Sequence, residues 1–151
     1  MEYPELTTEQ ISTLRALNNI PIFSGIGIHE LHLVAKKCHT IRVPPNEIII
    51  EQDDISNNLF FIVKGSVLVF KRSASEGWIK VNCLNAGDFF GEIALLRNVP
   101  RTARVTTKTP CTLLTISGAD FLEIYKIFPS NSRDNIQLIV AKRLAELKGS
   151  K

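Results

Sequence analysis

Long apolar runs are absent from this sequence, and so is a signal-peptide pattern at its amino terminus. A membrane-spanning helix needs about 18 or more consecutive apolar residues, so we expect no direct membrane insertion of this chain. We expect a cytoplasmic protein, or the cytosolic domain of a membrane protein. Hydrophobic residues make up 44% and charged residues 22% of the 151 residues, which is the balance of an ordinary globular protein with one domain.

The sequence also has little net charge and few cysteines. The net charge of +3 helps to attract a small anion but is too weak to indicate nucleic acid as a partner. The three cysteines, Cys38, Cys83 and Cys111, are odd in number, widely spaced and surrounded by apolar residues. This pattern favours reduced thiols in a cytosolic protein over a disulfide or a metal site.

Catalytic constellations are also missing. The sequence has no Ser-His-Asp grouping, no paired catalytic carboxylates and no nucleophile elbow. His29, His32 and His39 form the one group of histidines, but they precede the strand-rich part of the chain and fall outside any barrel interior. A metalloenzyme of the cupin type, the enzymatic alternative, would need inward-facing histidines. We therefore predict no catalytic residues, no metal site, no cofactor and no enzymatic activity.

The hydrophobic pattern changes twice along the chain, which predicts a single domain over residues 1–151 built from three segments. The first segment, residues 1–38, has apolar positions at helical spacing. Thr7 and Gln10 have the spacing of a capping box, so a helix is expected to begin there. A second short helix is predicted at about residues 29–37.

The middle segment, residues 39–117, contains short runs rich in Val, Ile, Phe and Thr, separated by turn residues. Seven or eight strands at this spacing predict an antiparallel β-roll of the jelly-roll type, so the expected fold class is α+β. The predicted strands are Thr40–Val43, Glu47–Ile50, Leu59–Val63, Ser66–Lys71, Trp78–Leu84, Ala103–Thr107 and Cys111–Ile116.

The last segment, residues 118–148, returns to the helical period. Ser117 is placed as an N-cap for a helix that is expected to run to about Ile127. Pro129 then breaks the pattern, and a final helix is predicted from about 132 to 147.

The stretch GDFFGEIALLRNVPRTA, residues 87–103, is longer than the tight turn that two neighbouring strands need. Its centre, Glu92 to Leu96, is predicted to be a helix too short to gain much stability from propensity alone. Such a helix offers free backbone N–H groups at its N-terminus, and Gly91 lets a ligand approach them closely. These groups are suited to binding phosphate.

Two charged side chains complete this stretch. Arg101 supplies a planar guanidinium that can donate to two phosphate oxygens. Glu92 supplies an acceptor, which a phosphate repels and a sugar hydroxyl favours. Together they predict a site for a phosphate and a ribose.

The same stretch resembles the phosphate-binding cassette of the cyclic-nucleotide-binding domain family, which occurs in bacterial catabolite activators, cyclic-nucleotide-dependent kinases, exchange factors and gated channels. The family pattern F-G-E-[IL]-A-L-L-x-x-x-P-R-[ATS]-A is matched at every fixed position by residues 90–103. LFFIVKGSV, residues 59–67, is similar to the family's third and fourth strands with their turn glycine. Asn46 and Asp53 replace two turn glycines of the family, and both residue types tolerate positive φ.

The resemblance implies that Glu92 accepts from the ribose 2′-hydroxyl, and that Arg101 and the backbone N–H groups of Gly91, Ile93 and Ala94 bind the cyclic phosphate. Thr102 would lie near the guanine amino group, although threonine occurs there in some cAMP-preferring members too. The final helix resembles a mobile lid that reaches the base. The ligand-binding residues predicted in this way are Phe90, Gly91, Glu92, Ile93, Ala94, Arg101, Thr102, Ala103, Arg143 and Leu147.

These inferences favour a non-enzymatic sensor that binds cAMP and/or cGMP and transmits binding by movement of its C-terminal helix. Because no DNA-recognition helix, kinase domain or exchange domain accompanies the cassette, we expect a stand-alone sensor or a regulatory part of a larger channel, transporter or kinase. The alternative is a degenerate family member that acts as a docking or dimerisation module without ligand. Such a module would be expected to have lost Glu92 or Arg101. The choice between cAMP and cGMP stays open at this point.

Overall fold

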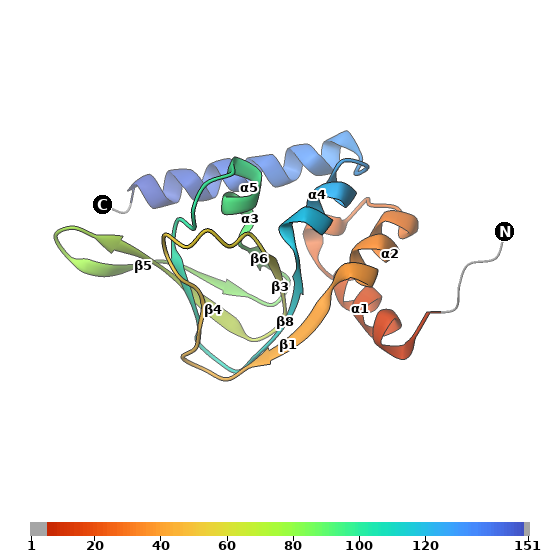
Figure 1. Cartoon of the computed structure of the whole chain (residues 1–151), viewed down its shortest axis with the longest axis horizontal. Coiled ribbons are helices and arrows are strands. Elements are labelled where there is room, and N and C mark those ends of the chain that lie inside the picture. Colours follow the sequence, from red (N-terminus) through yellow and green to blue (C-terminus); the bar gives the residue numbers. More distant parts are fainter. Residues whose placement is uncertain (1–5, 150–151) are drawn as a thin grey trace.

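Two four-stranded antiparallel sheets form the centre of the computed structural model, which describes residues 6–149 (Figure 1). This arrangement confirms the predicted α+β class with an antiparallel β-roll. The first sheet has the order β1 (His39–Val43), β8 (Cys111–Ile116), β3 (Leu59–Lys64) and β6 (Phe89–Phe90), and the second has the order β2 (Ile48–Ile50), β7 (Arg104–Thr107), β4 (Ser66–Ser73) and β5 (Gly77–Asn85).

Each predicted strand is present, with boundaries that differ by at most two residues. The two-residue strand β6, which the sequence pattern did not predict, forms because Phe89 and Phe90 pair with Phe61 and Phe60 of β3. Tertiary pairing creates this strand, since two residues carry no periodic signal of their own.

The helices before the roll are α1 (Thr8–Asn18), a 3₁₀ turn η1 (Pro21–Phe23) and α2 (Ile28–Lys37). The predicted capping box is confirmed, because the Gln10 backbone N–H donates to Thr7 Oγ1 at 3.1 Å and the Thr7 N–H donates to Gln10 Oε1 at 2.9 Å. Together these bonds satisfy two N–H groups that a helix start leaves without partners.

The helices after the roll are α4 (Gly118–Tyr125) and α5 (Ser130–Gly149). Ser117 caps α4 as predicted, accepting from the Asp120 N–H at 3.1 Å. Pro129 does not end α4, which stops earlier, but precedes α5, whose first backbone bonds reach the Pro129 carbonyl. Figure 1 shows α5 running across the roll past the short helix α3 (Glu92–Arg97), while α1, α2 and α4 gather at the other end. None of the described helices is both long and apolar enough to span a membrane.

Strands β3 and β8 of the first sheet are buried on both faces, whereas the edge strand β1 is largely exposed. Leu114 and Ile116 of β8 pack among the helices, whereas Leu113 of the same strand packs inside the roll. Phe61 of β3 faces the helices, where its ring lies 5.2 Å from that of Phe23. This double burial explains why β3 has a continuous apolar sequence rather than alternation.

The three cysteines are free thiols, as the sequence analysis expected. Cys38 and Cys111 are buried, and Cys83 is half-buried. Burial raises the pKa of the Cys38 thiol to about 12, so this side chain stays protonated at neutral pH. It therefore acts as a small apolar core residue.

The shared core of helices and sheet predicts the effect of truncating Phe61, which is 0% exposed. Phe61→Ala should lower the free energy of unfolding by about 3–5 kcal/mol, because it leaves a cavity between β3 and the helices. Ile55→Ala, at a side chain that is 88% exposed, should change it by less than about 0.5 kcal/mol. Chemical denaturation of both variants measures the difference, and similar losses would contradict this account of the core.

Candidate functional site

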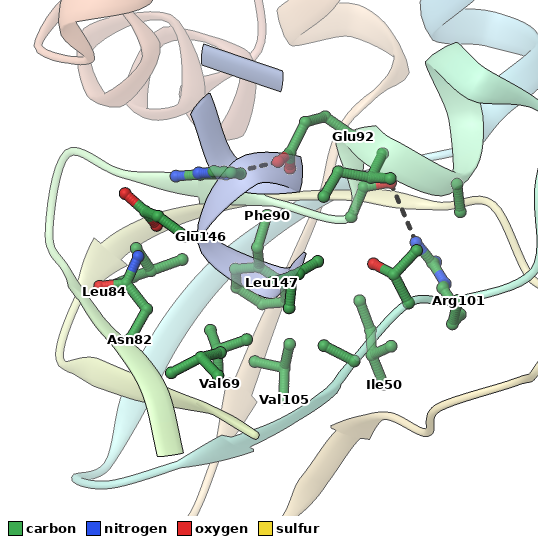
Figure 2. A pocket seen from close by; sticks show the side chains of 17 residues that line it. Ile50, Val69, Asn82, Leu84, Phe90, Glu92, Arg101, Val105, Glu146 and Leu147 are labelled. Carbon is green, nitrogen blue, oxygen red and sulfur yellow. Dashed lines mark hydrogen bonds and ion pairs between the residues drawn. The ribbon is translucent and has the colours of Figure 1, made fainter. Parts of the chain in front are cut away.

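A pocket of about 550 Å³, partly open to solvent, lies between the second sheet, α3 and α5 (Figure 2). All ten residues that the sequence analysis selected line it, although they come from two regions about forty residues apart: Phe90, Gly91, Glu92, Ile93, Ala94, Arg101, Thr102, Ala103, Arg143 and Leu147. The fold therefore brings the cassette and the final helix to one place.

Gly91 shapes the start of α3. Its φ of +94° lies in the left-handed region, and a Cβ there would be 2.7 Å from the Asn58 carbonyl oxygen and 2.9 Å from Arg101 Nη1. Both the backbone angle and the lack of space require glycine. The chain can therefore turn sharply from β6 into α3 at the edge of the pocket.

Arg101 is only 3% exposed, and its guanidinium bonds to neutral groups. Nε donates to Ser56 Oγ at 3.1 Å, Nη1 to the Gly91 carbonyl at 3.0 Å and Nη2 to the Asn58 carbonyl at 2.8 Å. These bonds use three of the five guanidinium N–H groups. None of the ion pairs among residues 6–149 includes Arg101.

Electrostatics at Arg101 reflect this burial. Desolvation lowers its pKa below the usual value for arginine, and the negative charges of Glu92 and Asp54 oppose that shift without contacting the guanidinium. The side chain remains a cation, because the ordinary pKa of arginine is far above neutral pH. A buried cation with two unused donors is complementary to an anion that reaches it through the pocket.

Glu92, at the first position of α3, is also 3% exposed. Its Oε1 accepts from Arg143 Nη1 of α5 at 2.7 Å, while its Oε2 is buried with no hydrogen-bond partner among the described residues. A buried carboxylate oxygen without a donor is costly, so it is well suited to accept from a ligand hydroxyl. Figure 2 shows this carboxylate at the top of the pocket, with the ion pair dashed.

Helix α5 covers the pocket through its last turns. Arg143 also donates to the Phe89 carbonyl at 2.7 Å and lies over the Phe89 ring at 4.7 Å. Leu147 is buried against Ile93 and Ala103 of the cassette region. Lys71 Nζ of β4 donates to the Leu147 carbonyl at 2.8 Å, which satisfies one of the free carbonyls at the end of the helix. The pocket is thus partly closed in this structure.

Sequence reasoning missed the pocket walls that the sheet provides. One cause is a bulge in β5: Val69 pairs with Asn82 and Phe70 pairs with Lys80, so Val81 is an extra residue. Neighbours in a regular strand point to opposite faces, but here Val81 and Asn82 both line the pocket. The missed pocket residues are Ile50, Val69, Val81, Asn82, Leu84, Val105 and Glu146.

Three further side chains of the region around the cassette make contacts within the protein. Arg104 pairs with an acid, since its Nε and Nη2 donate to Glu51 at 2.8 and 3.0 Å. Arg97 instead donates to Gln137 Oε1 of α5 at 2.8 Å. Phe90 is partly a core residue, because its ring stacks on Phe60 at 5.0 Å.

A comparison with protein families finds one match: the cyclic nucleotide-binding domain, over residues 40–128. Among curated relatives, the chain is 30% identical over 105 residues to a cAMP-dependent protein kinase regulatory subunit of Pyricularia oryzae, covering 70% of this chain and 26% of the relative. It is 29% identical over 130 residues to a cyclic nucleotide-gated potassium channel of Rhizobium etli, covering 86% and 34%. The chain thus spans about a quarter to a third of the length of these relatives.

Solved structures share the fold. The regulatory domain of Toxoplasma gondii PKA, crystallised with cAMP, superposes with a TM-score of 0.80 at 21% identity, over 89% of this chain and 50% of that one. The catabolite activator protein of Thermus thermophilus gives a TM-score of 0.72 at 24% identity, over 85% and 60%. Because the family match extends over more than half of the sequence and includes the whole pocket-forming cassette, this chain belongs to the cyclic nucleotide-binding domain family.

Proposed function

We propose that this chain binds a cyclic nucleotide, cAMP and/or cGMP, in the pocket under α5 and passes the binding event to an effector. The proposal rests on two buried charged side chains in one pocket, one with unused hydrogen-bond donors and the other with an unused acceptor. Within residues 6–149, Arg101 has unused donors and no acidic partner, and Glu92 has an unused acceptor oxygen. A molecule with an anionic phosphate next to a sugar hydroxyl satisfies both.

In this proposal, each part of the ligand contacts a different group of pocket residues. The cyclic phosphate occupies the space at Arg101 and the backbone N–H groups of Gly91, Ile93 and Ala94. The ribose 2′-hydroxyl donates to Glu92 Oε2. The base extends toward Leu147 and the apolar wall of the sheet, with Thr102 as a candidate contact. Phe90 and Ala103 shape the apolar surface between these parts.

The family is regulatory, and we propose that the chain has no catalytic role and needs no cofactor. Its signal is a shift in the position of α5, since a ligand changes an equilibrium only through different affinities for the two states. Glu92 supports this coupling, because the same carboxylate contacts Arg143 of α5 and is offered to the ligand.

The effector is proposed to be a channel, transporter or kinase that contains or binds this domain. The relatives include kinase regulatory subunits and cyclic nucleotide-gated channels, each much longer than this chain. We propose no contact with nucleic acid and no membrane insertion for this domain. Three free thiols fit a reducing compartment such as the cytoplasm.

The phosphate contact predicts the effect of replacing Arg101. Arg101→Ala should weaken binding of cAMP and cGMP by more than about 2 kcal/mol, or roughly 30-fold, because it removes a charge-assisted phosphate contact. Titration calorimetry on chain stripped of bound nucleotide measures this loss. Arg101→Lys, which keeps the charge without the planar fork, should give an intermediate affinity.

The matched control is Arg42→Ala, which removes an exposed arginine from β1 and should change affinity less than about twofold. Thermal unfolding of both variants checks that they fold. Near-native affinity of a folded Arg101→Ala variant would refute the phosphate assignment. No binding to the wild-type chain would instead favour a docking or dimerisation module without ligand.

The ribose contact predicts a coupled effect. Glu92→Gln should weaken binding of the natural nucleotide by about 5-fold to 10-fold, since a charge-assisted acceptor is lost, and should barely change binding of its 2′-deoxy analogue. Calorimetry with both ligands and both proteins forms a double-mutant cycle. The control is Glu123→Gln on the exposed face of α4. Equal losses for the two ligands would mean that Glu92 does not contact the 2′-hydroxyl.

The covering helix predicts a kinetic effect. Truncation after Lys142 removes Arg143, Glu146 and Leu147 from the pocket and should speed nucleotide dissociation by about 10-fold or more, since affinity changes mostly act on the off-rate. Stopped-flow release of a fluorescent cyclic nucleotide measures it. Leu138→Ala, on the exposed side of α5, is the control. An unchanged off-rate after truncation would show that α5 only packs against the roll.

A further inference from the structure

Asn82 stands out among the side chains that line the pocket. The sheet side of the pocket is otherwise built from apolar residues, among them Val69, Val81 and Leu84, and Asn82 brings an amide into this wall. Asn82 pairs with Val69, and Leu84 lies two residues further along β5, so the regular alternation of the strand turns Asn82 to the same face as these two pocket residues. A polar group that a strand directs into an apolar wall is a candidate for recognising a ligand.

The orientation of this amide is fixed by the backbone. The Cys83 N–H donates to Asn82 Oδ1 at 2.8 Å. A backbone N–H can only donate, so the atom that it meets must be the amide oxygen and the other arm must be the nitrogen. Among the described residues, Asn82 Nδ2 has no hydrogen-bond partner. Asn82 therefore presents a donor, and not an acceptor, to the pocket.

The position of Asn82 places it at the end of the pocket that receives the base. Figure 2 shows Asn82 and Glu146 at one end and Arg101 at the other, with Leu147, Phe90 and Val69 between them. A phosphate held by Arg101 and a ribose held by Glu92 leave the base to extend along this apolar wall. Asn82 belongs to the sheet rather than to α5, so its donor is in place before the helix closes.

Purines differ at the edge that meets such a donor. Guanine and hypoxanthine carry O6, an acceptor, whereas adenine carries the N6 amino group, which can only donate there. Two donors that face each other cannot pair, and each then loses its bond to water. A donor that meets position 6 of the base therefore distinguishes 6-oxopurines from adenine, whereas one that met N7, an acceptor in both, would not.

We propose that Asn82 is a specificity-determining residue that donates from Nδ2 to O6 of the base, so that this pocket favours a cyclic nucleotide with a 6-oxopurine over cAMP. This inference rests on the proposed function, since it requires that a cyclic nucleotide binds in the orientation given above. In this proposal the base has two candidate contacts, Asn82 from β5 and Thr102 from the cassette.

Calorimetry with cGMP, cIMP and cAMP tests the inference on the wild-type chain and on Asn82→Val. The variant should bind cGMP and cIMP about 5-fold to 10-fold more weakly, as expected for one lost hydrogen bond, and cAMP within about twofold of wild type. cIMP has O6 but no 2-amino group, so a lower affinity of the variant for cIMP reports on the O6 contact alone. Asn82→Asp, which replaces the donor with an acceptor, should shift selectivity toward cAMP.

Valine is suited to this strand, where it flanks Asn82 at position 81, and thermal unfolding checks that each variant folds. Asn85→Val is the matched control, because it makes the same change in the same strand at an exposed residue outside the pocket. It should leave all three affinities within about twofold.

A measurement that needs no variant uses the wild-type chain with cyclic purine monophosphate, which lacks any 6-substituent. It should bind about 5-fold more weakly than cIMP. Equal affinity of these two ligands, or equal losses of cAMP and cGMP in Asn82→Val, would overturn the role of Asn82 and leave the proposed function standing. No binding of any cyclic nucleotide to the wild-type chain would overturn both.

Discussion

Burial of the Arg101 guanidinium, with no acidic partner in the described part of the chain, is the constraint around which the site is built. Moving a cation out of water is costly, and here two carbonyls and one hydroxyl offset only part of that cost. The carbonyls belong to Gly91 and Asn58, so the guanidinium holds the loop before β3 against the start of α3. Backbone bonds between Arg101 and the 53–54 turn add to this contact. In the proposed function the remaining donors bind an anion, so the same side chain would have a structural and a functional role.

Glu92 extends this electrostatic arrangement to the covering helix. Without Arg143, the Glu92 carboxylate would be a buried anion with no cationic contact among the described residues. Without Glu92, the Arg143 guanidinium of α5 would lose its ion pair. The pair joins the helix to the cassette. In the proposed function, a ligand hydroxyl that donates to Oε2 would contact the same carboxylate as Arg143, which would give the ligand a physical route to the helix.

The pocket combines parts of two kinds. Asn82, Val69 and the cassette are held by the sheets and by backbone hydrogen bonds, so they are in place before a ligand arrives. Arg143 and Leu147 come from α5, which is held to the roll by side-chain contacts and by Lys71 at its end. A rigid wall suits selectivity for the base, and an element with fewer backbone bonds to the roll suits signalling. The roles proposed for β5 in selectivity and for α5 in signalling agree with this difference.

The cassette is the part that the sequence determined by itself. Gly91, Glu92 and Arg101 lie within eleven residues, so a glycine, a short helix and an arginine at fixed spacing form a signal that can be read from one short stretch. The strand-rich middle and the flanking helices followed from periodicity for the same reason. Only the tertiary structure decided which partners meet across long separations: Glu92 with Arg143, Lys71 with the end of α5, and Asn82 with Val69 in the wall of the pocket. Those contacts depend on strand register and on the docking of one helix, which are set by the packing of the whole core and have no signature in any short stretch of sequence.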